Sequence, residues 1–150
     1  MTSLQRTDHV DHSAPEITTL ITHHLKSTTA QSNSKVRSAS IAVIGDTAYM
    51  TVIPTLPLDP ATSAAEQTRQ IFQSIEDRLA SVGSNKGQIA HITIWLSHLH
   101  YFDEVTAVWN EWVDPDHPPV RACAQVALAN KDLKVEMIVV AHVPAAAAVD

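Results

Sequence analysis

The amino-acid sequence predicts an α+β fold, in which a mixed β-sheet has two helices packed on one face. Three observations predict it: two helical stripes of apolar residues, several short runs rich in β-branched residues, and strands that come in pairs near both ends of the chain. A length of 150 residues suits one domain, which we expect to span residues 17–143. Residues 1–16 are polar and aperiodic and residues 144–150 are mostly alanine, so both ends are expected to be flexible.

The first three predicted strands precede any helix. Thr18–Leu25 is a candidate edge strand, and residues 40–44 and 47–53 are two strands joined by a tight turn. Gly45 and Asp46 form that turn, because both residue types tolerate a positive φ angle. Prolines follow the third strand and end it, since proline cannot donate a hydrogen bond to a sheet.

Two helices follow from capping signals and periodicity. Ser63 with Glu66 three residues later is a capping-box pattern, and Gly83 follows the last apolar position as a stop signal. The apolar stripe between them comprises Thr68, Ile71, Phe72, Ile75, Leu79 and Val82. A second helix is expected over residues 102–113, with Phe102, Val105, Trp109 and Trp112 on one side, before a proline-rich break.

Three further strands are predicted at residues 89–96, 120–128 and 134–143, the last two joined as a hairpin by a turn at residues 129–132. In the first of these strands, the residues expected on one face are Ala90, Ile92, Ile94 and Leu96. In the last two strands, mostly apolar residues occupy both alternating sets of positions, so both faces of the sheet are expected to be buried. Two helices cover only one face, and the sequence therefore predicts an obligate oligomer in which another subunit covers the second face.

Composition excludes several classes of protein. Ten Lys and Arg against sixteen Asp and Glu give a net charge of −6, which argues against a nucleic-acid partner. The single cysteine, Cys123, excludes an intrachain disulfide and a zinc site built from cysteines. No apolar run approaches the roughly 18–20 residues that span a bilayer, and the N-terminal sequence lacks the features of a secretory signal. We therefore expect a cytoplasmic protein with no membrane partner.

Two charged residues, Arg121 and Glu136, stand inside otherwise apolar strands. A buried charge must be paired or used. The planar fork of a guanidinium suits a carboxylate, and a carboxyl group in a partly dry cleft can handle a proton. Two interpretations remain open: a structural salt bridge between the two residues, or a substrate site in which both groups face one shared crevice.

The sequence around these residues resembles a known family. Pro119–Leu128 (PVRACAQVAL) followed by Lys134–Ala141 (KVEMIVVA) is similar to the C-terminal signature of the RidA/YjgF/YoaB (Rid) family. Upstream, Gly83–Lys86 (GSNK), Ile94–Ser97 (IWLS) and Gly45–Thr51 (GDTAYMT) are similar to the YoaB branch. The resemblance extends over most of the predicted domain, with the elements in the expected order.

This resemblance implies a chorismate-mutase-like α+β fold and a homotrimer whose sheets surround a central barrel, with clefts between subunits. It also implies hydrolysis of a reactive enamine or imine that bears a carboxylate, such as 2-aminoacrylate or iminopyruvate, to a keto acid and ammonia. No metal or organic cofactor is expected. A protonated imine is already electrophilic, so anchoring its carboxylate and presenting a water supply much of the needed orientation.

The resemblance also implies roles for individual residues. Arg121 is expected to bind the substrate carboxylate, and Glu136 is expected to position the attacking water. The backbone at Cys123 and the hydroxyl of Thr51 are expected to contact substrate. Ser38, also expected at the substrate site, stands where many RidA-type members have a tyrosine. The loss of that aromatic wall leaves open which substrate fits and whether the deaminase activity is retained.

Other functions compete with this interpretation. The chain can be a non-catalytic member of the family that binds a small carboxylate ligand between subunits, with a regulatory or chaperone-like role. The endoribonuclease activity attached to the family by name conflicts with the net charge and with the lack of a Lys/Arg stripe. For Cys123 no activating base can be assigned, which favours a small buried strand residue over a nucleophile. His98, His100 and Asp103 lie close in sequence, but metal sites normally need three or four ligands, and a polar loop is the simpler explanation.

Overall fold

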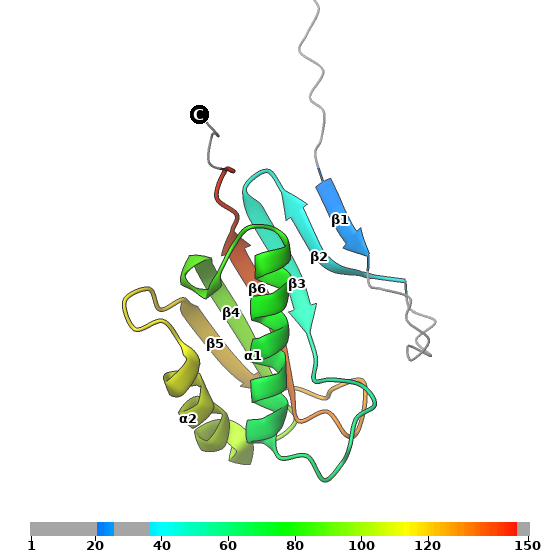
Figure 1. Cartoon of the computed structure of the whole chain (residues 1–150). Helices are drawn as coiled ribbons and strands as arrows, with labels where there is room; N and C mark the ends of the chain where they lie inside the picture. Colours follow the sequence, from blue (N-terminus) through cyan, green and yellow to red (C-terminus); the bar gives the residue numbers. More distant parts are fainter. Residues whose placement is uncertain (1–20, 26–36, 147–150) are drawn as a thin grey trace, which may run out of the picture.

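The computed structural model describes residues 21–25 and 37–146, and it contains the predicted order of strands and helices (Figure 1). In chain order the strands are β1 (Ile21–Leu25), β2 (Ala39–Ile44), β3 (Thr47–Val52), β4 (Ile89–Leu96), β5 (Val120–Gln125) and β6 (Val135–His142). The helices are α1 (Ala64–Ser81) and α2 (Phe102–Trp112), with 3-10 turns at Lys86–Gln88 and Leu99–Tyr101. The predicted arm at residues 1–16, the start of the first predicted strand and the end of the predicted tail lie outside the described residues.

The six strands form one mixed sheet in the order β1-β2-β3-β6-β4-β5. Neighbouring strands are antiparallel except for β4 and β5, which are parallel. β4, α2 and β5 therefore form a βαβ unit, because parallel neighbours need a crossover connection. The prediction that the last two strands form a hairpin is wrong, since β4 lies between β5 and β6.

Both helices lie on one face of the sheet, as predicted (Figure 1). The core between helices and sheet includes Ile71, Ile75 and Leu79 of α1, Val105 of α2, Ile92, Ile94 and Leu96 of β4, and Val135, Met137 and Val139 of β6. Each fully buried aliphatic side chain contributes about 1.5–3 kcal/mol relative to an exposed one. Within residues 21–25 and 37–146, neither helix has the length and apolar character needed to span a bilayer.

Local signals fix the ends of α1 and the first turn. The hydroxyl of Ser63 accepts a hydrogen bond from the backbone N–H of Glu66 at 3.1 Å, which confirms the predicted start of the helix. Gly83 follows the helix with φ +76°, and Gly45 has φ +59° in the turn between β2 and β3. Both conformations favour glycine, which has no Cβ to clash.

A buried glutamine joins α1 to the connection before β6. Nε2 of Gln67 donates to the carbonyl oxygen of Asp132 at 2.9 Å, and Oε1 of Gln67 accepts from the backbone N–H of Lys134 at 2.8 Å. Both polar ends of this buried side chain are therefore satisfied. The contact ties the residues just before β6 to α1.

The other face of the sheet carries no helix in the described chain, and we call it the open face. It consists of Ala42 and Ile44 of β2, Thr47, Tyr49 and Thr51 of β3, His91, Thr93 and Trp95 of β4, Val120, Ala122 and Ala124 of β5, and Glu136, Ile138, Val140 and His142 of β6. Tyr49 is 46% exposed and Val120 is 69% exposed. Large apolar side chains thus remain uncovered in a single chain, and their coverage by another subunit stays a prediction.

Two details of the predicted strands are wrong. Ile89 is buried and Ala90 is exposed, because the pairing register shifts between Ile89 and His91 as in a β-bulge. β5 ends at Gln125, earlier than predicted. The side-chain oxygen of Gln125 accepts from the backbone N–H of Leu99 at 2.9 Å, where the chain leaves β4 for α2.

Candidate functional site

Arg121 lies on β5 and points to the helix-covered face. Its register partner on β4 is Ile92, whose side chain is fully buried beneath the helices. Nη2 of Arg121 donates to Oγ1 of Thr106 in α2 at 2.9 Å. The guanidinium carbon lies 5.4 Å from the ring centroid of Phe102 and 5.2 Å from that of Trp109, so two aromatic rings of α2 make cation–π contacts with the charge.

No carboxylate within the described residues forms an ion pair with Arg121. Its Nε atom is buried and has no hydrogen-bond partner there. A buried, unpaired donor is costly and calls for an explanation. The site thus has a cation that is held in place by neutral groups and has no negative partner in the part of the chain that the structure describes.

Glu136 lies on the open face, because its register partner on β4 is Trp95 rather than one of the buried isoleucines. Thr51 of β3 pairs with Ile138 of β6, two residues from Glu136, and therefore shares the same face. Partial burial raises the pKa of the Glu136 carboxyl group above its ordinary value. A carboxyl group with a raised pKa, on the same face as a hydroxyl and an aromatic ring, is suited to accept a proton.

The expectation that Arg121 and Glu136 face one shared crevice is wrong for a single chain. The two side chains project from opposite faces of the sheet, and β4 separates their strands. The alternative of a structural salt bridge between them is wrong for the same reason. The βαβ connection explains the outcome, since it inserts β4 where a hairpin would have made β5 and β6 neighbours.

Cys123 lies two residues after Arg121 on the same face of β5. Burial raises the pKa of the Cys123 thiol, and the positive charge of Arg121 opposes that shift only in part. The thiol is therefore kept protonated, which argues against a nucleophile. β5 is an edge strand, so one side of its backbone is free of sheet partners within the described residues.

Sequence reasoning missed Arg78, which controls the spacing of β2 and β3. Its Nη1 donates to the carbonyl oxygens of Ser40 at 3.0 Å and of Thr51 at 2.9 Å. Burial lowers the pKa of this guanidinium, which has no acidic partner within the described residues. Ser38 is exposed just before β2, so Arg78 ties together the two strand segments that carry Ser38 and Thr51. A charged residue three positions after buried Ile75 was the available signal.

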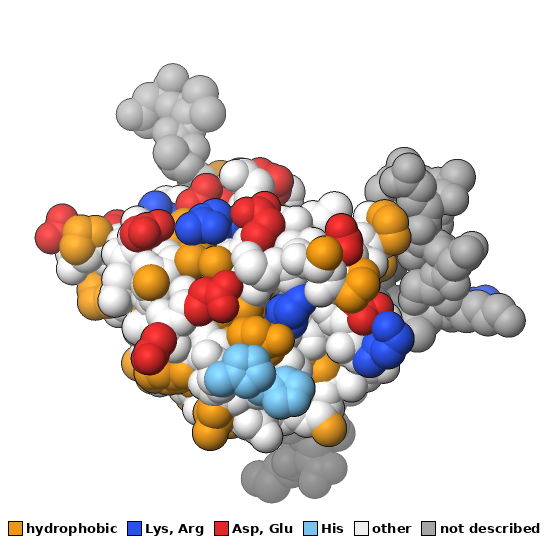
Figure 2. All heavy atoms as spheres, turned by 90° about the horizontal axis from the view of Figure 1, so that it is seen from below, with side chains coloured by type: hydrophobic (Ala, Val, Ile, Leu, Met, Phe, Trp, Pro, Cys, Tyr) orange, Lys and Arg blue, Asp and Glu red, His pale blue; other side chains and the backbone are white. Residues whose placement is uncertain are grey.

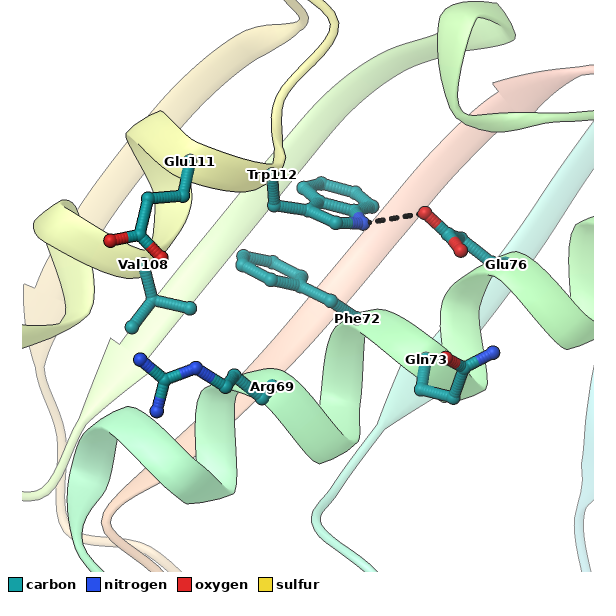
Figure 3. Close-up of a pocket in the computed structure, with 7 residues that line it drawn as sticks. All are labelled: Arg69, Phe72, Gln73, Glu76, Val108, Glu111 and Trp112. Carbon is teal, nitrogen blue, oxygen red and sulfur yellow. Dashed lines mark hydrogen bonds between the residues drawn. The ribbon is translucent and has the colours of Figure 1, made fainter.

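A separate hollow of about 220 Å³ lies between the outer sides of the two helices (Figure 3). It is lined by Arg69, Phe72, Gln73, Glu76, Val108, Glu111 and Trp112. The rings of Phe72 and Trp112 stack at 3.9 Å, and Nε1 of Trp112 donates to Oε1 of Glu76 at 2.8 Å. None of the predicted site residues lines this hollow, and its aromatic rings are used for packing between the helices.

His98 and His100, which follow β4, are both exposed, and Figure 2 shows a pair of histidine side chains on the face seen from below. The rings of His98 and His100 are 5.1 Å apart, and no group of three or more His, Cys, Asp or Glu side chains within residues 21–25 and 37–146 could hold a metal ion. On this face the Lys and Arg side chains are scattered among acidic ones and form no basic stripe (Figure 2). This end of the molecule therefore lacks the charge pattern typical of a nucleic-acid surface.

A six-stranded mixed sheet of this order, with two helices on one face, is a YjgF-like fold. The family described as Endoribonuclease L-PSP matches residues 25–143. The RutC family protein YoaB of Escherichia coli K12 is 34% identical over 111 residues, which cover 74% of this chain and 95% of that protein. The chain therefore belongs to the RutC/YjgF/L-PSP (Rid) family, as its C-terminal motif predicted.

Solved structures agree with this assignment. A crystal structure of a protein from Pseudomonas aeruginosa has a TM-score of 0.67 and 33% identity, and covers 79% of this chain and 98% of its own. A YjgF-family protein from Neisseria meningitidis has a TM-score of 0.72 at 24% identity, covering 85% of this chain and 98% of its own, and supports the fold. A more distant relative, 28% identical over 93 residues, is a 2-iminobutanoate/2-iminopropanoate deaminase from Salmonella typhimurium; the match covers 57% of this chain and 73% of that protein.

Proposed function

We propose that this protein hydrolyses a small reactive imine, or its enamine tautomer, that carries a carboxylate. Water adds to the imine carbon and forms a carbon–oxygen bond, and the carbon–nitrogen bond of the resulting aminol then breaks. The products are a keto acid and ammonia, which leaves with a proton from the aminol hydroxyl. The reaction needs no metal or organic cofactor, and the same proposal places the protein in the cytoplasm.

The observation that carries this proposal is the state of Arg121. Its guanidinium is held by Thr106 and two aromatic rings, has a buried unpaired Nε, and lacks an ion pair among the described residues. A substrate carboxylate would supply the missing negative charge through two parallel hydrogen bonds. The relative from Salmonella typhimurium, by its name, acts on imino acids of this kind, and all of them bear a carboxylate.

The site is completed by a second copy of the chain. Arg121 and Glu136 point away from each other in one protomer, so they can meet only if the open face of one copy approaches the β5 edge of another. The apolar and nearly uncharged open face favours such an approach. In the homotrimer that we propose, each cleft takes Arg121 and the Cys123 backbone from one subunit and Glu136 and Thr51 from its neighbour.

Glu136 is the proposed general base. Because its pKa is raised, the Glu136 carboxylate is a stronger base and accepts a proton from the attacking water more readily. Thr51 shares its face and can orient the same water or the leaving nitrogen. Ser38, in place of a larger aromatic residue, leaves room for a bulkier substrate.

A coupled assay tests the activity. A pyridoxal-phosphate enzyme generates 2-aminoacrylate, and keto-acid formation is followed with and without this protein. Arg121→Ala should lower kcat/KM at least about 100-fold, since a charge-assisted bidentate contact is lost. Lack of acceleration by the wild-type protein across several imino acids would refute the proposal.

Mixing variants tests the shared cleft. Arg121→Ala and Glu136→Gln should each be inactive alone, and refolding them together should restore part of the activity, because some clefts then receive an intact arginine and an intact glutamate. A single-subunit site would show no such recovery. The oligomeric state of each variant, measured by light scattering, is the control.

A second candidate is a non-catalytic protein that binds a small carboxylate ligand. The separation of Arg121 from Glu136 favours it, because one chain offers the anchor without the base. Under this alternative, benzoate or pyruvate would raise the melting temperature in an Arg121-dependent way, while imine hydrolysis would stay at the uncatalysed rate.

A further inference from the structure

We infer that Thr106 of α2 is a positioning residue, which fixes the in-plane orientation of the Arg121 guanidinium and so selects the edge on which a carboxylate binds. The inference rests on the proposed function only in taking the ligand to be a carboxylate. The contacts that hold the guanidinium all lie within a single chain. Thr106 is not among the residues that the family motif singled out.

Of the three side chains that contact the Arg121 guanidinium, only Thr106 makes a contact that depends strongly on direction. The central carbon of the cation lies 5.4 Å from the Phe102 ring centroid and 5.2 Å from that of Trp109, and this kind of attraction depends weakly on how the guanidinium is rotated. The hydrogen bond from Nη2 to Oγ1 of Thr106, at 2.9 Å, depends strongly on angle. Thr106 therefore sets the in-plane orientation that the rings leave free.

That orientation decides which donors remain for a ligand. Nε is buried without a partner, and Nη2 gives one of its hydrogens to Thr106. Within the described residues Nη1 makes no hydrogen bond, and it is not among the buried unpaired atoms, which leaves it available to a ligand. A carboxylate is thus directed to the terminal edge formed by Nη1 and the second hydrogen of Nη2, and away from the side edge that contains Nε.

Because Nε is buried without a partner, the guanidinium tends to rotate, and the hydrogen bond to Thr106 opposes that rotation. An unpaired buried donor gains free energy by turning toward water or a backbone carbonyl. Without the hydroxyl of Thr106, the guanidinium of Arg121 is free to make that turn, and the terminal edge then no longer faces the ligand. Groups held before the ligand arrives bind it with less loss of freedom.

The test uses the full-length protein and three variants. Thr106→Val keeps the branched shape and removes the hydroxyl, and Thr106→Ser restores it. Thr68→Val is the matched control, because the Thr68 hydroxyl makes a buried hydrogen bond to the carbonyl of Ala64 at 2.7 Å within α1, remote in sequence from the anchor. Calorimetry gives Kd for benzoate and pyruvate, and the coupled assay gives kcat and KM.

We expect Thr106→Val to raise both Kd and KM about tenfold, with a smaller change in kcat, because the lost contact serves ground state and transition state alike. Thr106→Ser should return both constants to within about twofold of wild type, and Thr68→Val should leave them unchanged while lowering the melting temperature. The Arg121 Nε–H resonance should exchange slowly in the wild type, because Nε is buried, and faster in Thr106→Val.

The outcomes separate this inference from the proposed function. Thr106-dependent binding of benzoate without imine hydrolysis would support the inference and refute the enzymatic activity. Imine hydrolysis with unchanged Kd, KM and Nε–H exchange in Thr106→Val would refute the inference and leave the activity standing. Failure of the wild-type protein to bind either carboxylate would overturn both.

Discussion

The two faces of this sheet are made by the same strands and have opposite characters. On the helix-covered face, Ile92 and Met137 are fully buried within one chain. On the open face, their strand neighbours include Trp95 and Ile138, which are only partly buried and have no helix of the described chain over them. One face is therefore complete in a single protomer, and the other has a partner only if another molecule supplies it.

The charges follow the same division. Arg121, on the helix-covered face, makes its cation–π contacts and its hydrogen bond to Thr106 within one chain. Glu136, on the open face, carries a raised pKa because it is partly desolvated. A protomer can thus prepare the binding half of a site alone, whereas the proton-handling half becomes useful only beside another copy.

The largest expected effect contrasts two adjacent residues of β6. Met137→Lys places an unpaired ammonium in the core, which costs several kcal/mol, a large fraction of the about 5–15 kcal/mol that stabilises a typical domain. Ile138→Lys places the same group on the open face and should leave a folded chain that no longer assembles. Circular dichroism in urea and light scattering measure the two effects; equal loss of stability in both variants would show that the faces do not differ as described.

An intermediate effect is expected at Arg78, which lies between α1 and the sheet. Arg78→Met removes the donor to the carbonyls of Ser40 and Thr51 and should lower the free energy of unfolding by about 2 kcal/mol. Arg69→Met on the same helix is the control, because the Arg69 side chain is 54% exposed and its ion pair with Glu66 is 3.8 Å long. A comparable loss in both variants would remove the role assigned to Arg78.

The smallest effect concerns Glu136 and depends on pH. Because its pKa is raised in the folded state, the fold is favoured by protonation, and this contribution is lost as the pH rises from 4.5 through the folded-state pKa. Glu136→Gln should therefore raise the melting temperature slightly at pH 7 and leave it nearly unchanged at pH 4, while abolishing imine hydrolysis. A variant that is less stable than wild type at pH 7 would contradict the raised pKa.

Much of the fold could be predicted from local signals. The capping serine at residue 63, the stripe on α1 and the turn at Gly45 depend on neighbours in sequence, and each gave the correct element. The position of β4 between β5 and β6 depends on contacts between distant segments, and the hairpin prediction failed there. The bulge at Ile89 failed for a similar reason, since a register shift is set by the partner strand.

The candidate site divides in the same way. The family motif identified Arg121 and Glu136, but alternation along each strand did not reveal that they occupy opposite faces. Thr106 and Arg78 went unnoticed because a polar residue on a helix has an ordinary appearance in sequence. Their importance arises only from what the fold brings against them, a guanidinium in one case and two carbonyl oxygens in the other.

The buried amide of Gln67 has a consequence for this arrangement. A slip of β6 by a single position would exchange its two sets of side chains and turn Glu136 inward beneath the helices. Gln67 holds the carbonyl of Asp132 and the N–H of Lys134, the residue just before the strand begins. The side-chain amide of Gln67 in α1 thus fixes the register of β6, and it keeps the Glu136 carboxylate outside the core of its own chain.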